Sequence, residues 1–292
     1  MSMSVEVPPK APPIPQLPWP LIAWFGALLV AGYLPVLGVL IKTWSGEDMG
    51  HGYFVPVIAG YIIWQSRDDL MSIEARTNWW GLAVVLYAGL QLFIGTLGAE
   101  GFLSQTSFVI ALFGIVLLLG GTGVVKRLFF PLFLLFFMVP IPGVAYNRIT
   151  LPLQIVASKL ATGALTVVGI PVLREGNILE LPTQRLSVVE ACSGIRSLLS
   201  LTFLSMVYGY FFEKRTWLRV VLFLATIPIA ILANGSRITV TGILSQVKPD
   251  LAEGFFHEST GWVIFMIAFA ILIGFHHIVR RTASLVEKRR HS

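Results

Sequence analysis

The sequence predicts an all-α polytopic membrane protein with about eight transmembrane helices, an additional interfacial or re-entrant helix and a small extracytoplasmic β-like segment. Hydrophobic residues make up 55% of its 292 residues and charged residues only 12%, and the mean hydropathy is +0.80. This composition is far from that of a soluble domain and is typical of an integral membrane protein. The apolar residues also fall into separate runs, and basic residues cluster between them.

Eight apolar runs have the length of a membrane span or come close to it. These runs cover 19–41, 53–65, 79–98, 102–120, 127–141, 194–212, 218–233 and 260–279. A ninth stretch, 151–170, is long enough to cross a membrane, but it contains Pro152, Gln154 and Lys159. Length alone therefore leaves its placement open.

The basic residues decide how the runs are placed. They gather at Arg67 and Arg76, at Lys126 and Arg127, at Lys214, Arg215 and Arg219, and after Arg280. By the positive-inside rule these are four cytoplasmic segments. Four such segments fit eight spans with both termini inside only if 151–170 does not cross, so we expect it to lie on the outer side. The net charge of +6 then reflects orientation and anionic lipid headgroups and requires no nucleic acid partner.

Three regions follow from this arrangement. Residues 1–18 are rich in proline and are expected to form a disordered cytoplasmic leader. Residues 19–281 form the membrane domain, and 282–292 form a basic cytoplasmic tail. On the outer side, 172–189 alternates apolar residues around two turns, which predicts one or two short strands.

Cys192 is the only cysteine of the chain, so an internal disulfide and a paired-cysteine metal or redox site are excluded. No metal and no cofactor is expected. The cysteine stands where a polar stretch gives way to an apolar run. A thiol at a helix N-terminus near cations has a lowered pKa and becomes a nucleophile.

The predicted topology places Arg237 and His257 on the same outer face as Cys192. Arg237 follows the run 218–233, and His257 precedes the run 260–279. Histidine can take and return a proton near neutral pH, whereas a guanidinium stays charged and suits a developing oxyanion. Taken singly, each residue also has a structural reading, as a packing thiol, a snorkelling arginine or an interfacial histidine. Their joint placement favours a site.

Four further residues are expected to support this site or bind the substrate. They are Glu190, Arg196, His51 and Asn234. Arg196 lies four residues after the cysteine and so shares its helix face, and Glu190 either orients the histidine or an arginine or pairs with Arg196. His51 stands between two glycines and either lines the site or caps a helix. His276 and His277, near the inner end, are expected to be interfacial.

Four short motifs together resemble the exosortases, polytopic cysteine enzymes of Gram-negative inner membranes. They are HGYFVP near the second run, ACSGIRSL opening a later one, NGSRI after the next and HESTGW before the last. The likeness extends over about 20–280. It implies an enzyme that recognises a C-terminal sorting signal of exported proteins, made of a PEP motif, a transmembrane helix and a basic tail. Such an enzyme cuts near the motif and passes the protein to an acceptor, with the active site facing the periplasm.

The resemblance also implies that Cys192, Arg237 and His257 form the catalytic triad. Two alternatives remain open. One is a purely hydrolytic intramembrane cysteine protease, which releases its substrate without transfer. The other is a transporter or scaffold for exported polysaccharide, in which Arg196, Arg237 and His257 bind an anionic lipid-linked sugar and the thiol has no covalent role.

Overall fold

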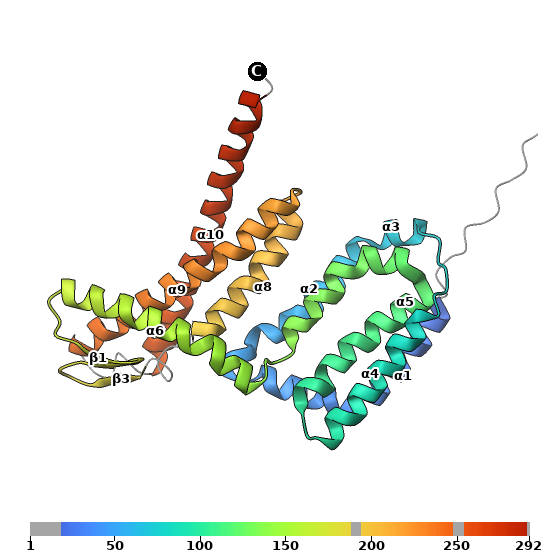
Figure 1. The fold of residues 1–292 in the computed structure, drawn as a ribbon, viewed down its shortest axis with the longest axis horizontal. Coiled ribbons are helices and arrows are strands. Elements are labelled where there is room, and N and C mark those ends of the chain that lie inside the picture. The colour runs from blue at the N-terminus through green and yellow to red at the C-terminus, as the bar shows by residue number, and fades with distance from the viewer. Residues whose placement is uncertain (1–18, 188–193, 248–253, 291–292) are drawn as a thin grey trace, which may run out of the picture. The chain divides into compact units, whose positions relative to one another are not determined.

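The computed structural model describes residues 19–187, 194–247 and 254–290. Most of these residues are helical, and three short strands form one sheet (Figure 1). The chain divides into two compact units, 1–140 and 141–292. Residues 1–18, the predicted leader, lie outside the described residues.

The first unit contains five α-helices and two 3₁₀ helices. In chain order these are α1 (Trp19–Trp44), η1 (Glu47–Tyr53), α2 (Phe54–Gln65), α3 (Arg67–Ser72), α4 (Trp80–Leu97), α5 (Gly101–Leu134) and η2 (Leu135–Met138). Glycines allow α4 and α5 to touch backbone to backbone, since a Cβ built on Gly81 would lie 2.6 Å from the Gly114 carbonyl oxygen. Small residues at a helix crossing are a common means of packing helices in membranes.

Helix α5 folds back on itself at Gly121. This residue has φ 74° and ψ −173°, outside helical values, and a Cβ on it would lie 2.2 Å from the Arg76 carbonyl oxygen. This conformation is open essentially only to glycine, and there is no room for a side chain. Figure 1 shows the chain turn back at this point of α5. The predicted runs 102–120 and 127–141 are therefore two arms of one kinked helix together with η2.

The second unit is built on three helices with a fourth beside them. They are α6 (Gly143–Val167), α8 (Gly194–Phe212), α9 (Thr216–Val247) and α10 (Gly254–Arg290). Leu201, Leu222, Ala230 and Leu272 belong to the buried core that α8, α9 and α10 share. Helix α6 instead lies along the second half of α9, where a Cβ on Gly235 would lie 3.2 Å from Cβ of Leu160.

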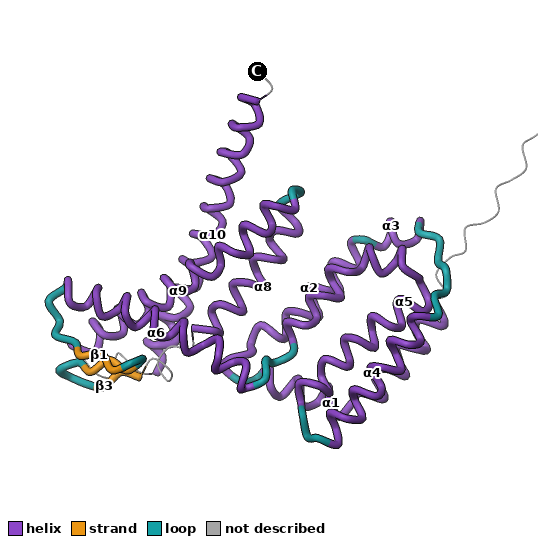
Figure 2. Tube along the Cα trace, viewed as in Figure 1, coloured by secondary structure: helices purple, strands orange, loops and turns teal. Residues whose placement is uncertain are grey.

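Three strands form a small antiparallel sheet against α6 (Figure 2). They are β1 (Leu173–Glu175), β2 (Ile178–Glu180) and β3 (Arg185–Ser187), paired in that order. Gly176, with φ 65°, makes the first turn, and Ser158 of α6 donates a hydrogen bond to its carbonyl oxygen at 3.1 Å. The predicted β-like segment is thus present, with one strand more than the upper expectation.

The described residues confirm a mostly helical membrane protein but not the count of eight spans. Five helices are long and apolar enough to cross: Pro20–Trp44, Trp80–Leu97, Gly101–Met138, Thr216–Val247 and Ser259–Val286. The difference arises partly because the kinked helix α5 is one element where two spans were predicted, and partly because α2 has only 12 residues. Helix α8, with 19 residues, is not among the five. Nor is α6, which contains most of the stretch 151–170.

Two helices are longer than their apolar runs. The run 218–233 was expected to end before Asn234, yet α9 continues through it to Val247. The run 260–279 lies within α10, which begins at Gly254 and ends at Arg290, so the predicted basic tail is helical up to that residue. Apolar composition marks where a helix can meet lipid, whereas the backbone hydrogen bonds of the helix continue beyond that point.

Candidate active site

The polar NGSR sequence lies within α9, and all of its residues except the exposed Ser236 are buried or half-buried. Asn234 is only 5% exposed, and Gly235 contacts α6. Because Arg237 follows Asn234 by three residues, both lie on one side of the helix. Arg237 is half-buried. The arginine is therefore held within the second unit and does not simply extend toward lipid headgroups.

A small hollow, partly open to the outside, lies between α8, α9 and α10. Its lining includes the polar side chains of Ser197 of α8 and of Asn234 and Arg237 of α9, together with Gly261 of α10. The other lining residues are apolar and include Leu201 and Phe265. Each of the motifs ACSGIRSL, NGSRI and HESTGW contributes at least one residue to this hollow.

Arg237 touches α10 directly. A Cβ built on Gly261 would lie 3.0 Å from Cζ of Arg237, 3.1 Å from its Nη2 and 3.2 Å from its Nε. Position 257 precedes Gly261 by four residues, so the two positions share a face of α10. The contact therefore brings the guanidinium to the side of α10 that carries position 257.

Two of the predicted site residues, Cys192 and Glu190, lie outside the described residues, as does the side chain of His257. The backbone of His257 belongs to the start of α10. Arg196 lies in the first turn of α8, next to Ser197, and is half-buried. The expected meeting of Cys192, Arg237 and His257 stays a prediction, supported by the contact between α9 and α10.

His51 belongs to the first unit, where it joins the two 3₁₀ helices. Its Nε2 lies 3.2 Å from the Phe137 carbonyl oxygen, and Trp44 Nε1 donates to the carbonyl oxygen of Met138 at 2.8 Å. Burial lowers the pKa of His51 below its ordinary 6.5, and the hydrogen bond to Phe137 only partly opposes this. The ring is thus neutral near pH 7 and donates from Nε2 to that carbonyl. The glycine after it, Gly52, makes room for the Trp44 ring.

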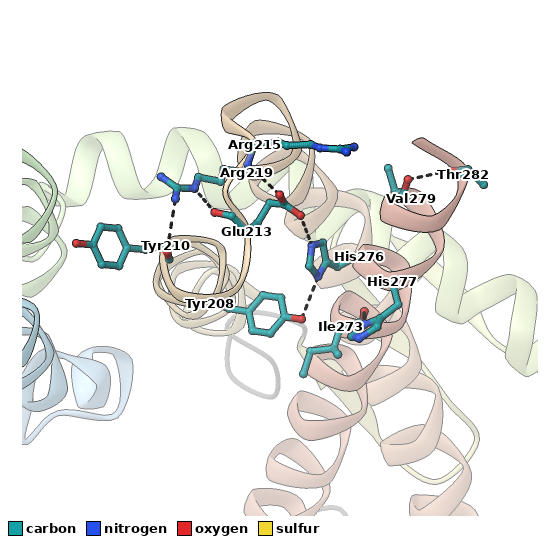
Figure 3. A network of polar contacts seen from close by, with 10 residues as sticks. All are labelled: Tyr208, Tyr210, Glu213, Arg215, Arg219, Ile273, His276, His277, Val279 and Thr282. Carbon is teal, nitrogen blue, oxygen red and sulfur yellow. Dashed lines mark hydrogen bonds and ion pairs between the residues drawn. The ribbon is translucent and has the colours of Figure 1, made fainter. Parts of the chain in front are cut away.

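Sequence reasoning missed a buried polar network at the other end of α8, α9 and α10 (Figure 3). Glu213 Oε2 lies 2.9 Å from Nε2 of His276, and Nδ1 of the same ring lies 3.0 Å from the hydroxyl of Tyr208. The side chains of Glu213 and His276 are 4% and 1% exposed. His276, expected at the interface, is therefore a core residue, while His277 is exposed. An acidic residue inside a basic segment was the signal that could have indicated it.

The carboxylate of Glu213 is stabilised in its charged form. Burial by itself raises the pKa of Glu213, but hydrogen bonds from His276 and from the backbone N–H groups of Arg215 and Lys214 outweigh it and hold the pKa below its ordinary 4.5. Because an ionised carboxylate only accepts, Nε2 of His276 carries the proton and donates it. Nδ1 of a neutral ring then accepts from Tyr208.

Within the described parts of the chain, no three His, Cys, Asp or Glu side chains come together as a metal ion would require. The chemistry available around the hollow is that of a fixed cation beside the starts of α8 and α10. Such a cation, kept partly away from water, can hold a developing negative charge.

A comparison with family models matches residues 43–274 to the transmembrane exosortase family (Exosortase_EpsH). No curated protein and no solved structure matches the chain. The matched range contains all four motifs and every helix from η1 to α9, together with most of α10. Because it covers well over half of the sequence, the chain belongs to the transmembrane exosortase family.

Proposed function

We propose that this exosortase is a membrane-embedded cysteine peptidase and transpeptidase. Its substrates are exported proteins that end in a PEP-type sorting signal with a transmembrane helix, and it passes the cleaved protein to an acceptor. The observation that carries the proposal is the hollow to which α8, α9 and α10 each bring a residue of a polar motif. Membership of the family supports the same assignment.

The proposed reaction runs through one thioester. The thiolate of Cys192 attacks the scissile carbonyl carbon, and the guanidinium of Arg237 stabilises the oxyanion that forms. When the C–N bond breaks, His257 gives its proton to the leaving amine. His257 then takes a proton from the acceptor amine or from water as that nucleophile attacks the thioester, and the thiolate leaves.

The other predicted residues have supporting roles in this scheme. Asn234 lies one turn before Arg237 and lines the same hollow, so it can bind the substrate backbone beside the oxyanion. Glu190 and Arg196 flank the cysteine in sequence and set the charge around it. The supporting role expected of His51 stays a prediction, since its hydrogen bond to Phe137 lies within the first unit. No cofactor is required for any step.

The proposed setting is the bacterial inner membrane, with both termini in the cytoplasm and the hollow open toward the periplasm. The partners are the substrate proteins, membrane lipids and an acceptor molecule. No nucleic acid takes part. The sidedness follows from the basic segments near Arg67, Lys126, Lys214 and Arg280.

Processing of a tagged reporter that ends in the sorting signal tests this function. In membranes that contain the full chain, we expect Cys192→Ala and Cys192→Ser to abolish cleavage. Arg237→Ala should lower the rate by about 10²–10³-fold, the usual loss when one oxyanion donor is removed. Arg237→Lys should restore little of it, because an ammonium lacks the planar fork of donors.

Mass spectrometry of the reporter's new C-terminus separates transfer from hydrolysis. An adduct on that carboxyl group supports transpeptidation, whereas a free carboxylate supports the purely hydrolytic protease. If Cys192→Ser leaves processing intact, the thiol has no covalent role and the proposal fails. A transporter or scaffold that binds an anionic lipid-linked sugar predicts instead that the chain supports polysaccharide export without cleaving the reporter, and that Cys192→Ser leaves this export intact.

A further inference from the structure

The guanidinium of Arg237 presents its flat face to α10. Of its atoms near the Cβ position of Gly261, the central Cζ is the nearest at 3.0 Å, with Nη2 at 3.1 Å and Nε at 3.2 Å. An approach in the plane of the group would bring the nitrogens nearest and leave the carbon behind them. Because Cζ is instead nearer than either nitrogen, the Cβ position of Gly261 lies over the plane of the guanidinium. The N–H donors point outward within that plane, so they run along the surface of α10.

Glycine is the residue that leaves room for this contact. Ordinary van der Waals contact of a Cβ begins at about 3.4 Å, so a methyl group on Gly261 would press on three guanidinium atoms at once. Gly261 lies inside α10, where glycine is less favourable than alanine. By contrast, a Cβ on Gly274 of the same helix would meet nothing within 4 Å.

We propose that Gly261 is a positioning residue for Arg237. The guanidinium packs against the backbone of Gly261, and this contact fixes its position and orientation in the hollow between α8, α9 and α10. This inference rests on the proposed function, in which Arg237 stabilises the oxyanion. A side chain at position 261 moves the cation away from α10 by a few tenths of an ångström and turns its donors away from the oxyanion.

The consequence for catalysis is specific to the transition state. Misplacement of a catalytic group by 1 Å can cost about 10²-fold in rate, so a shift of a few tenths is expected to cost roughly 5- to 20-fold. The substrate's ground state gains nothing from an oxyanion donor, so kcat falls while KM stays nearly constant. A general disturbance of the fold would instead lower the amount of folded protein.

The test compares Gly261→Ala with Gly274→Ala in the full chain in membranes, with reporter processing as the readout. We expect Gly261→Ala to lower kcat about 5- to 20-fold and Gly274→Ala to stay within about twofold of the wild type. Both exchanges replace glycine by alanine in α10, so their effects on helix propensity match. Thermal melting in detergent should show that both variants are folded.

A double-mutant cycle decides whether the glycine acts through the arginine. If it does, Gly261→Ala changes the residual activity of Arg237→Ala by less than about twofold. An equal loss in both backgrounds would overturn the positioning role, as would wild-type kcat in Gly261→Ala while Arg237→Ala is impaired. Failure of the proposed function looks different, because Cys192→Ala would then process the reporter and Arg237→Ala would be active as well.

Discussion

Glu213 and His276 are the residues whose burial the sequence concealed. They stand 63 positions apart, and the histidine lies in an apolar run beside arginines, where an interfacial role is the ordinary expectation. Only the packing of α10 against α8 brings the His276 ring within hydrogen-bond distance of the Glu213 carboxylate. Arg237 was easier to find, because a cation next to an apolar run is conspicuous. Gly261 could not have been singled out, since its importance lies in the contact with another helix.

Removal of the His276 ring nitrogens should destabilise the second unit. In His276→Phe the buried carboxylate of Glu213 loses a charged hydrogen bond, and we expect about 3 kcal/mol less stability. His277→Phe is the matched control, because His277 is exposed and its Nδ1 lies 2.8 Å from the carbonyl oxygen of Ile273 in its own helix. Thermal melting in detergent measures both.

A second exchange identifies the cause. Glu213→Gln in the His276→Phe background removes the buried charge and should recover part of the lost stability. Equal melting temperatures for His276→Phe and His277→Phe would show that the hydrogen bond between His276 and Glu213 contributes nothing to the stability of the fold. A loss in His276→Phe that Glu213→Gln fails to relieve would point to ring packing as the cause.

At the scale of the elements, the sequence predicted where the helices are but not where they end. Hydropathy ends the helix that precedes Arg237 at residue 233, yet α9 continues for another 14 residues. This second half packs on α6 through Gly235 and Gly242. A helix of 32 residues is roughly 48 Å long and exceeds a hydrocarbon core of about 30 Å. Its polar part is stabilised by protein contacts that composition cannot reveal.

The reversal of α5 at Gly121 should be intolerant of any side chain. Gly121→Ala places a Cβ against the Arg76 carbonyl oxygen at a positive φ, and we expect a loss of at least about 2 kcal/mol. Gly89→Ala in α4 is the control, because a Cβ there meets nothing within 4 Å. Its stability should equal or slightly exceed that of the wild type.

The yield of folded protein and the melting temperature in detergent measure the stability of both glycine variants. If Gly121→Ala has the same melting temperature as the wild type, the backbone of α5 can adopt another conformation at this point, for example a continuous helix. Such a helix would make residues 101–138 a single span. The element therefore bears directly on how often the chain crosses the membrane.

At the scale of the whole molecule, segments predicted on one side of the membrane contact each other within each unit. In the first unit, Arg127 donates to Asp69, which joins two segments predicted to be cytoplasmic, while His51 contacts Phe137 at the predicted outer end. In the second unit, Glu213 and His276, which are both predicted to lie near the cytoplasmic side, form a hydrogen bond. At the opposite end Gln246 donates to Thr183 at 2.7 Å. The number of crossings itself stays a prediction, since five of the described helices are long and apolar enough to cross.

Single cysteines can test the crossing number, because Cys192→Ala leaves a chain without cysteine. The test places one new cysteine at a time on the exposed positions Ser72, Glu100, Thr183 and Thr282. With eight spans, a membrane-impermeant maleimide added to spheroplasts should label Glu100→Cys and Thr183→Cys. It should reach Ser72→Cys and Thr282→Cys only after the membrane is permeabilised.

The five-helix count makes a different prediction for the same four positions. If only the five long helices cross, Ser72, Thr183 and Thr282 lie on one side and Glu100 lies on the other. Ser72 and Thr183 are thus the decisive pair, because eight spans separate them and five spans do not. Labelling of both from the same side would remove the periplasmic placement of the hollow, since its sidedness depends on the same count of crossings.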